Sequence, residues 1–258
     1  MFSCSKSDYS NKIDEFCLFL SEQNVDICCV TETWFNSNVP DSLICPKGYA
    51  VFRRDRDTPG GGVAIFARDV ICAVTVDIPA EFKHVEAICV DLTFSEAACR
   101  VICMYRKPGF NDVDVAYMSD CVKCLQKLCS TDRLVVVTGD CNLPDLDWSY
   151  YYGPNTAAYN MFINFVNSYG FYQYVDKPTR NDNILDIVMA TSDTFVEDLT
   201  VLVQIGTSDH NTVVFKTNLL VRNAGVNTST SYFYFARADY AAINLCLAAI
   251  DWNDIFQS

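Results

Sequence analysis

Several side chains of this 258-residue sequence combine the chemical types and the positions that hydrolytic catalysis requires. They are carboxylates, an amide, a phenol and an imidazole, and each stands within or directly after an apolar run of strand length. A strand end fixes the backbone while the side chain remains able to reach a ligand. Without a candidate serine or cysteine nucleophile, this inventory is typical of metal-assisted hydrolysis of a phosphoester. The residues are Glu32, Tyr105, Asp140, Asn142, Asp186, Asp209 and His210.

The densest part of this set lies in the segment LVVVTGDCNLPDLDW, from Leu134 to Trp148. Its first residues form a β-branched apolar run that predicts a buried strand, and Asp140 and Asn142 follow where that strand ends. Taken alone, the segment fits a solvated Asp/Asn turn that caps a helix better than a catalytic site, and only the other strand ends favour the catalytic interpretation. Asp145 and Asp147 are expected to cap or solvate that turn.

The elements that would position these side chains are strands mixed with a few helices. Apolar residues at helical spacing predict helices over Asn11–Asn24, Asp112–Cys129, Thr156–Gly170 and Asp239–Ile250. The helix that begins at Asp112 leads from one strand into the next and therefore predicts a parallel crossover. The expected strands are Val25–Thr31, Tyr49–Arg53, Val63–Ala67, Ile71–Val76, Val85–Leu92, Arg100–Tyr105, Leu134–Val137, Ile184–Ala190, Leu199–Ile205, Thr212–Lys216 and the short aromatic segment YFYF near the C-terminus.

Charge and cysteine usage narrow the functional class. The formal net charge of −13 argues against an unaided electrostatic grip on a polyanion, which normally shows as a basic domain or stripe. The fourteen cysteines accompany no secretory signal pattern, which favours a reducing compartment. Cys121 and Cys124 form a CxxC inside a helical pattern and are not expected to bind metal. The cysteines expected in the core are Cys28, Cys29, Cys72, Cys89, Cys99 and Cys103.

Other features have simple structural interpretations. No apolar stretch is long enough to span a bilayer, so no membrane association is expected. His84 is expected at the surface or paired, and Glu86 in a local pair or facing solvent. Gly60–Gly62 predicts a loop that needs positive φ, because nothing helical follows it. Trp34 is expected to pack beside the site.

The motifs taken together resemble a known group, the endonuclease/exonuclease/phosphatase superfamily, and within it the apurinic-like endonuclease domain of non-LTR retrotransposons. The resemblance is colinear over nearly all of the chain. GDCN differs from the commoner GDFN only at Cys141, between the two functional side chains. The matching segments are TETW at Thr31–Trp34, RRDRDTPGGGVAIFAR at Arg53–Arg68, MYRKPG at Met104–Gly109, GDCNLP at Gly139–Pro144, LDIVMA at Leu185–Ala190 and SDH at Ser208–His210.

The resemblance implies a role for each matching residue. Glu32 and Asp209 would be the metal ligands, with Mg²⁺ as the cation and Mn²⁺ as an alternative. Asp140 would orient or deprotonate the attacking water, and Asn142 would hold the scissile phosphate. The remaining implied roles are charge stabilisation by His210 with Asp186 hydrogen-bonded to it, a phosphate hydrogen bond from Tyr105, and backbone-phosphate contacts from Arg106, Lys107, Lys177 and Arg180.

The resemblance also implies the architecture and the partners. The expected fold is a four-layer α/β sandwich, with two mixed sheets packed face to face and helices outside. Residues 1–220 would form the endonuclease domain, and residues 221–258 a linker and helical connector that would precede a reverse transcriptase in the parent polyprotein. A monomer that acts on DNA in the nucleus is expected.

One departure from the family pattern leaves alternatives open. The first strand of these proteins usually carries an asparagine in a stretch such as TNARSL, whereas Ser5 is the nearest equivalent here. The main hypothesis is Mg²⁺-dependent endonucleolytic hydrolysis of DNA that leaves a 3′ hydroxyl. A phosphatase or phosphodiesterase acting on a lipid or small phosphate ester is one alternative. A catalytically inactive retrotransposon remnant or binding module is the other.

Overall fold

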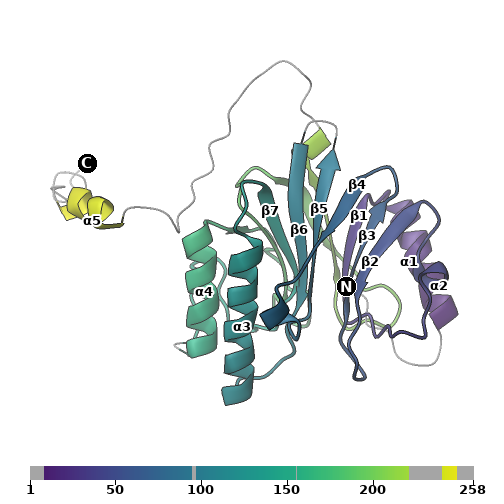
Figure 1. The fold of residues 1–258 in the computed structure, drawn as a ribbon, viewed down its shortest axis with the longest axis horizontal. Helices are drawn as coiled ribbons and strands as arrows, with labels where there is room; N and C mark the ends of the chain where they lie inside the picture. The colour runs from purple at the N-terminus through teal and green to yellow at the C-terminus, as the bar shows by residue number, and fades with distance from the viewer. Residues whose placement is uncertain (1–8, 95–96, 155, 221–239, 249–258) are drawn as a thin grey trace.

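The computed structural model describes residues 9–94, 97–154, 156–220 and 240–248 (Figure 1). Within these ranges no helix is long and apolar enough to cross a membrane. The helices are α1 Tyr9–Glu22, α2 Asp41–Ile44, α3 Asp112–Leu128, α4 Ala157–Tyr169 and α5 Tyr240–Ala248, with 3₁₀ turns η1 Ala80–Phe82 and η2 Asn218–Leu220. The strands are β1 Ile27–Thr31, β2 Tyr49–Arg54, β3 Val63–Arg68, β4 Cys72–Val76, β5 Ala87–Phe94, β6 Ala97–Tyr105, β7 Leu134–Asp140, β8 Tyr172–Gln173, β9 Asp186–Ala190, β10 Val196–Leu202 and β11 Thr212–Thr217.

The strands form a six-stranded sheet in the order β4-β5-β6-β7-β9-β8, a three-stranded sheet β1-β3-β2 and the pair β10-β11. All neighbouring strands are antiparallel except β6 and β7, which α3 connects as a parallel crossover. The crossover predicted from the sequence is therefore confirmed. It brings the C-terminal ends of β6 and β7 to the same edge of the sheet.

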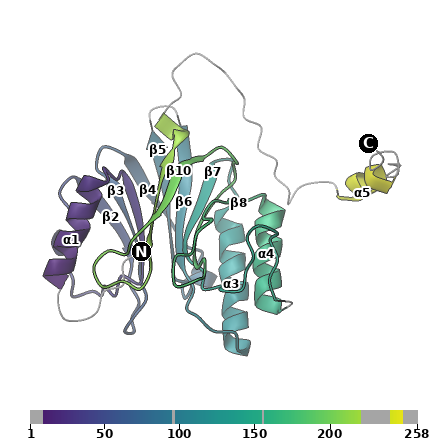
Figure 2. The ribbon, with the colours of Figure 1, turned by 180° about the vertical axis from the view of Figure 1, so that it is seen from behind.

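Alternation along β5 and β6 divides the core into layers. Ile88 and Val90 face one side and pack against β3, whereas Ala87 and Cys89 face the other side and pack against α3. A third apolar cluster joins α1 to the outer face of β1 and β3. Figures 1 and 2 show α3 and α4 side by side on one flank of the molecule and α1 on the opposite flank. The predicted α/β sandwich of helices, sheet, sheet and helix is confirmed.

The structure corrects some expectations. Cys72 is exposed on the edge strand β4 instead of lying in the core, because that strand has a partner on one side only. The short elements α2 and β8 were not predicted, since four or two residues give no measurable periodicity. The aromatic segment YFYF lies outside the described residues, as does most of the expected linker.

Candidate active site

Strand register brings three of the predicted residues to one end of the six-stranded sheet. Tyr105 is the parallel partner of Asp140 across β6 and β7, and Asp186 is the antiparallel partner of Asp140 across β7 and β9. Gly139 makes this close pairing possible, because a Cβ there would lie 1.9 Å from the Met104 carbonyl oxygen. The glycine has φ +130°, a region that other residues rarely adopt.

Asp140 and Asn142 form a closed hydrogen-bonded unit at the end of β7. Asn142 donates its backbone N–H to Asp140 Oδ1 at 2.9 Å and its side-chain Nδ2 to Asp140 Oδ2 at 2.7 Å. Nδ2 also donates to the Arg106 carbonyl oxygen at 2.8 Å. Both side chains are buried, and Asn142 adopts φ +49°, so the backbone is held in an uncommon conformation at this point. This rigidity is what a water-orienting carboxylate requires.

His210 and Asp186 form the second pair. His210 Nδ1 lies 2.8 Å from Asp186 Oδ2, and both side chains are more than nine-tenths buried. Ser208 Oγ accepts the His210 backbone N–H at 3.1 Å and fixes the loop that carries the imidazole. Asp186 Oδ1 is buried and has no hydrogen-bond partner within the described chain. The arrangement orients Nε2 of His210 and stabilises its protonated form.

Glu32 joins the site from the other sheet. It follows β1, adopts φ +50° and accepts a hydrogen bond from the Tyr105 hydroxyl at the end of β6. Arg56 lies over the Tyr105 ring, with its Cζ 5.7 Å from the ring centre. The contact between Glu32 and Tyr105 therefore joins the two sheets at the rim where Asp140 also lies.

The pKa shifts show that these groups act on one another. Burial raises the pKa of Asp140 to about 7, and the negative charges of Asp186 and Glu32 contribute to the rise, whereas His210 and the Asn142 N–H oppose it. Burial alone would lower the pKa of His210, but its hydrogen bond to Asp186 and nearby carboxylate charges raise it overall. Burial and the Glu32 contact raise the pKa of Tyr105, which keeps its hydroxyl protonated as a donor.

A loop beside the site was only partly foreseen. Glu86 lies in a local pair, as predicted: Arg56 Nε donates to Glu86 Oε1 at 2.9 Å, and the Gly62 N–H donates to Oε2 at 2.7 Å. Gly60–Gly62 has positive φ throughout, as expected. A Cβ at Gly61 would lie 2.3 Å from the Glu86 carboxylate. No local pattern links Arg56 to Glu86, because the two residues are 30 positions apart in the chain.

Other simple expectations are also confirmed. His84 is exposed and lies 2.9 Å from Asp120. Asp147 caps its own turn by accepting the Ser149 N–H at 2.8 Å. Asp145 accepts a hydrogen bond from the Tyr159 hydroxyl at 3.1 Å and so tethers the turn to α4.

Arg106 does not fit the predicted contact with DNA. Its side chain is completely buried, and its guanidinium donates to the backbone carbonyls of Asn142 at 3.0 Å, Cys141 at 3.2 Å and Gly109. A cation enclosed in this way cannot reach a phosphate in solvent. Arg106 instead braces the loop that holds Asn142. The resemblance implied that Arg106, in the polar motif that follows β6, would contact a phosphate. In the structure three backbone carbonyls point inward and accept hydrogen bonds from its guanidinium.

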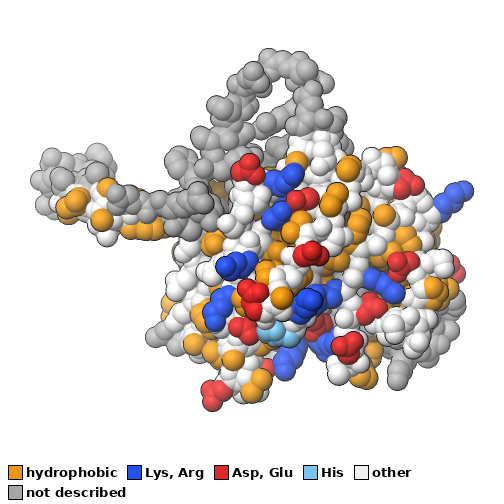
Figure 3. Space-filling view, viewed as in Figure 1, with side chains coloured by type: hydrophobic (Ala, Val, Ile, Leu, Met, Phe, Trp, Pro, Cys, Tyr) orange, Lys and Arg blue, Asp and Glu red, His pale blue; other side chains and the backbone are white. Residues whose placement is uncertain are grey.

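The remaining predicted cations are at the surface. Lys107 is half exposed and lies 3.4 Å from Asp114, and Lys177 is exposed. Arg180 forms an ion pair with Asp209, with Nη2 2.5 Å from Oδ2. Figure 3 shows Lys and Arg side chains interspersed with Asp and Glu on the visible face, without a continuous basic area.

Thr179 is a supporting residue that sequence reasoning missed. It is fully buried, and its Oγ1 accepts the backbone N–H groups of Leu185 and Asp186, each at 3.1 Å. Its carbonyl accepts the Asn211 N–H at 2.7 Å. Thr179 thus connects the loop before β9 with the loop that carries His210. A threonine next to Pro178 carries no distinctive signal in the sequence.

Of the two carboxylates predicted to hold a divalent cation, Glu32 fits that role and Asp209 is paired with a cation of the chain. Glu32 is a partly buried carboxylate at the rim, which suits Mg²⁺ because that ion takes few protein oxygens and keeps several waters. Asp209 is engaged by Arg180, and no group of three or more His, Cys, Asp or Glu in the described ranges is arranged to hold a metal. The donor chemistry fits at Glu32, whereas the role of Asp209 as a ligand stays a prediction.

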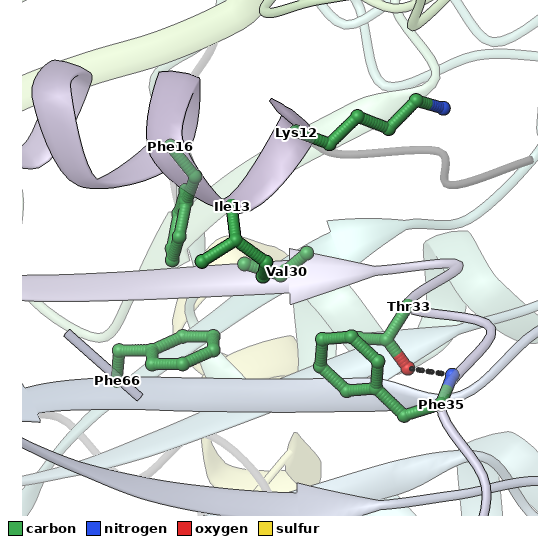
Figure 4. A pocket seen from close by; sticks show the side chains of 7 residues that line it. All are labelled: Lys12, Ile13, Phe16, Val30, Thr33, Phe35 and Phe66. Atoms are coloured by element: carbon green, nitrogen blue, oxygen red, sulfur yellow. Dashed lines mark hydrogen bonds between the residues drawn. The ribbon is translucent and has the colours of Figure 1, made fainter. Parts of the chain in front are cut away.

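A small pocket of about 30 Å³ lies behind the strand that leads to Glu32. Figure 4 shows Phe16 of α1, Val30 of β1 and Phe35 around it, with the Phe35 N–H directed at Thr33 Oγ1, 3.4 Å away. The lining is almost wholly apolar, and the volume is that of about one water molecule. The pocket therefore does not extend the candidate active site.

Comparisons with known proteins agree with the fold. Residues 99–214 match the family described as "Endonuclease-reverse transcriptase". The endonuclease domain of TRAS1, a telomere-specific non-LTR retrotransposon, has a TM-score of 0.60 and 14% identity, over 81% of this chain and 94% of that chain. An AP endonuclease from Archaeoglobus fulgidus has a TM-score of 0.58 and 16% identity, over 80% and 94%. The 3′ phosphatase NExo from Neisseria, bound to product DNA hairpin, has a TM-score of 0.63 and 14% identity, over 81% and 95%. No curated protein matches the sequence.

Proposed function

Because the chain has the fold of the endonuclease/exonuclease/phosphatase superfamily, we propose that it is a metal-dependent endonuclease that hydrolyses a DNA phosphodiester. The observation that carries this proposal is the meeting of Asp140, Asn142, Asp186 and His210 with Glu32 and Tyr105 at one rim. These groups come from both sheets, and their charges shift one another's pKa. A buried cluster of this kind would be costly to maintain as structure alone.

Each residue has a role that its contacts support. Asp140, with a pKa of about 7, would orient the attacking water and accept its proton near neutral pH. The Asn142 amide, which now donates to Asp140 and to the Arg106 carbonyl, would exchange one of these two acceptors for an oxygen of the scissile phosphate when substrate binds. His210, held by Asp186 and favoured in its protonated form, would stabilise the negative charge that develops on the phosphoryl oxygens. The protonated Tyr105 hydroxyl, which donates to Glu32 in this structure, would turn to donate to a phosphate oxygen when substrate binds.

Glu32 would hold a Mg²⁺ ion, with Mn²⁺ as an alternative, and the ion when bound would neutralise charge on the phosphate. Asp209 would complete this cation site only after release from Arg180. Lys107, Lys177 and Arg180 would contact the DNA backbone at the surface. Cleavage by in-line water attack would leave a 3′ hydroxyl.

The context of the reaction is also part of the proposal. The match to an endonuclease-reverse transcriptase family and to a retrotransposon endonuclease supports a role in target-site nicking, with a reverse transcriptase in the parent polyprotein. The 3′ hydroxyl would then prime DNA synthesis. With a DNA substrate of this kind the protein would act in the nucleus, and it would act as a monomer.

A phosphatase of the same fold is the second candidate. Two observations favour it: one of the similar structures is a 3′ phosphatase, and the net charge of −13 offers no general attraction for a polyanion. An inactive retrotransposon remnant is the third candidate, because Ser5 stands nearest to the position where these proteins usually carry an asparagine. Calorimetric titration with Mg²⁺ separates the last case, because an inactive site of this kind should bind the cation weakly or not at all.

Substrate choice provides the test of the proposal. Purified protein with Mg²⁺ is given supercoiled plasmid, an oligonucleotide with a 3′ phosphate, and an inositol phosphate in separate reactions. The proposal expects internal nicks in the plasmid whose ends a DNA polymerase extends without prior treatment. Release of inorganic phosphate from the last two substrates without plasmid nicking would contradict the endonuclease proposal and identify the protein as a phosphatase.

A further inference from the structure

An aromatic side chain, Phe110, is held at the surface next to the site and has no role in the chemistry described above. It lies in the loop between β6 and α3 and is 43% exposed, although large apolar side chains favour burial. Its ring stacks on Tyr159 of α4, with ring centres 5.3 Å apart and an interplanar angle of 10°. The Cζ atom of Arg106 lies 5.0 Å from the ring centre.

Phe110 is an exposed ring backed by buried side chains. Its two ring contacts, Tyr159 and Arg106, are almost completely buried, with 2% and 0% exposure, whereas Phe110 is 43% exposed. Phe110 therefore presents an accessible aromatic surface at the end of a packed group of side chains.

The loop around Phe110 is fixed rather than adaptable. The preceding Gly109 accepts a hydrogen bond from Arg106, and it has φ +137° with no room for a Cβ next to the Asp114 carboxylate. The following Asn111 caps α3 by accepting the N–H groups of Val113 and Asp114. A preorganised aromatic surface binds a planar ligand with little ordering cost.

Arg106 also fixes the distance from Phe110 to the site. Its guanidinium donates to the Asn142 carbonyl at 3.0 Å and lies 5.0 Å from the Phe110 ring centre. Phe110 is thus within a few nucleotide steps, of about 3.4 Å each when stacked, of the residue proposed to hold the scissile phosphate, because Arg106 contacts both. The cation next to the ring also reduces the negative potential of its exposed surface, which favours an electron-rich π system there.

We propose that Phe110 is a stacking platform for an unpaired nucleobase next to the scissile phosphate, and that the site acts on nucleic acid with a locally unstacked strand. This inference rests on the proposed function and names its substrate class. An inositol phosphate offers no planar base for this surface, and a base within an intact duplex already stacks on its neighbours. Lys107, half exposed and three residues earlier, lies on the same loop.

The test measures stacking separately from catalysis. A single-stranded oligonucleotide that carries 2-aminopurine is titrated with the intact chain in EDTA, and quenching of its fluorescence reports stacking. Phe110→Ala is expected to abolish the quenching, and Phe110→Trp to retain it. Phe110→Leu keeps the apolar cover over Arg106 and Tyr159 without a π face, so it should fold and still fail to quench. Tyr172→Ala is the matched control, because Tyr172 is 45% exposed on β8 at the other end of β9 from Asp186.

Catalysis provides the second readout. With Mg²⁺, Phe110→Ala and Phe110→Leu should lower kcat/KM for single-stranded or mismatched DNA by roughly 5- to 150-fold, the loss of one base stack. Cleavage of the same strand with tetrahydrofuran abasic analogues on both sides of the scissile phosphate, where no base can stack on Phe110, should be equal in wild type and Phe110 variants. If the wild-type chain hydrolyses neither substrate yet quenches 2-aminopurine through Phe110, the proposed function fails while this inference stands.

Two results would overturn the inference. The first is quenching by Phe110→Leu and Phe110→Ala that equals the wild type, or no quenching by the wild type itself. The second is a concentration-dependent dimer in sedimentation experiments that Phe110→Ala dissociates, together with unchanged DNA binding. That result would assign the surface to contact between two copies of this chain.

Discussion

Asp140 and Asp186 are directly paired across β7 and β9, and both carboxylates are buried at the rim where the two sheets meet. Two adjacent buried carboxylates resist simultaneous ionisation, and the pKa of Asp140 is raised to about 7 as a result of burial and of the charge on Asp186. His210 relieves the repulsion through its hydrogen bond to Asp186. The site is therefore organised to exchange a proton near neutral pH.

This relationship predicts how stability depends on pH. The pKa of Asp140 is higher in the folded chain than its ordinary value of 3.8, so the folded state binds the proton more tightly. Its contribution is full below about pH 4 and is lost as the pH rises through about 7. Between pH 4.5 and pH 8 the metal-free wild type should therefore lose more stability than Asp140→Asn, whose side chain does not titrate, by on the order of 2 kcal/mol.

Denaturant unfolding of both proteins at the two pH values measures this difference. Asp176→Asn, which removes an exposed carboxylate on a surface loop, is the control and should show little pH-dependent change. A wild type and an Asp140→Asn protein that lose equal stability between pH 4.5 and pH 8 would contradict a raised pKa of Asp140 in the folded chain.

The pH profile of the reaction should respond to Asp186. In the proposed mechanism nicking requires ionised Asp140 and protonated His210, so the rate should rise through about pH 7 and fall above the raised pKa of His210. Asp186→Asn removes a charge that raises both pKa values, so both limbs should move to lower pH, and the maximum rate should fall by about 10²- to 10⁴-fold. If the two limbs of the measured kcat/KM profile do not shift in Asp186→Asn, the charge of Asp186 does not raise the pKa values of Asp140 and His210.

Asp209 has two possible partners, and a double-mutant cycle distinguishes them. The observed ion pair predicts that Asp209 holds Arg180 for a backbone phosphate, so Asp209→Asn and Arg180→Ala should each weaken metal-free DNA binding by roughly 2- to 10-fold, with non-additive effects. The expected role as a metal ligand predicts instead that Asp209→Asn lowers the calorimetric affinity for Mg²⁺ and leaves DNA binding in EDTA unchanged. Lys216→Ala, which removes an exposed cation paired with Asp198, is the matched control.

Arg106 should behave as a structural residue. Its removal leaves the buried carbonyls of Cys141, Asn142 and Gly109 without their donor, so Arg106→Ala should lower the free energy of unfolding by about 3 kcal/mol or more. Lys177→Ala should change it by less than about 0.5 kcal/mol. Equal stability of both variants in urea unfolding would contradict the assignment of Arg106 as the brace of the Asn142 loop.

Much of the fold and of the candidate site could be predicted from the sequence. The apolar runs indicate where strands lie, and the short motifs indicate which polar side chains follow them. The apolar run before Gly139 and the helical pattern after Asp112 indicate a parallel crossover, and that crossover places Tyr105 beside Asp140. The pairing of His210 with Asp186 was implied by the family resemblance and is present at 2.8 Å.

The remaining features depend on contacts between residues that are far apart in the chain. Burial of Arg106 arises because three carbonyls converge on it, which no local pattern encodes. No local pattern predicts that Thr179 Oγ1 accepts the backbone N–H groups of Leu185 and Asp186, or that Arg180 forms an ion pair with Asp209. Exposure of Phe110 follows from its position over Tyr159, not from its neighbours in sequence.

The most direct test of the account is nicking of supercoiled plasmid by the purified chain in Mg²⁺ and in EDTA, with Asp140→Ala and His210→Ala beside the wild type. The account predicts open circles with Mg²⁺ only, a loss of at least about 10²-fold in each variant, and folded variants by circular dichroism. Nicking that survives EDTA or both substitutions, or no nicking by the intact wild type, would contradict it.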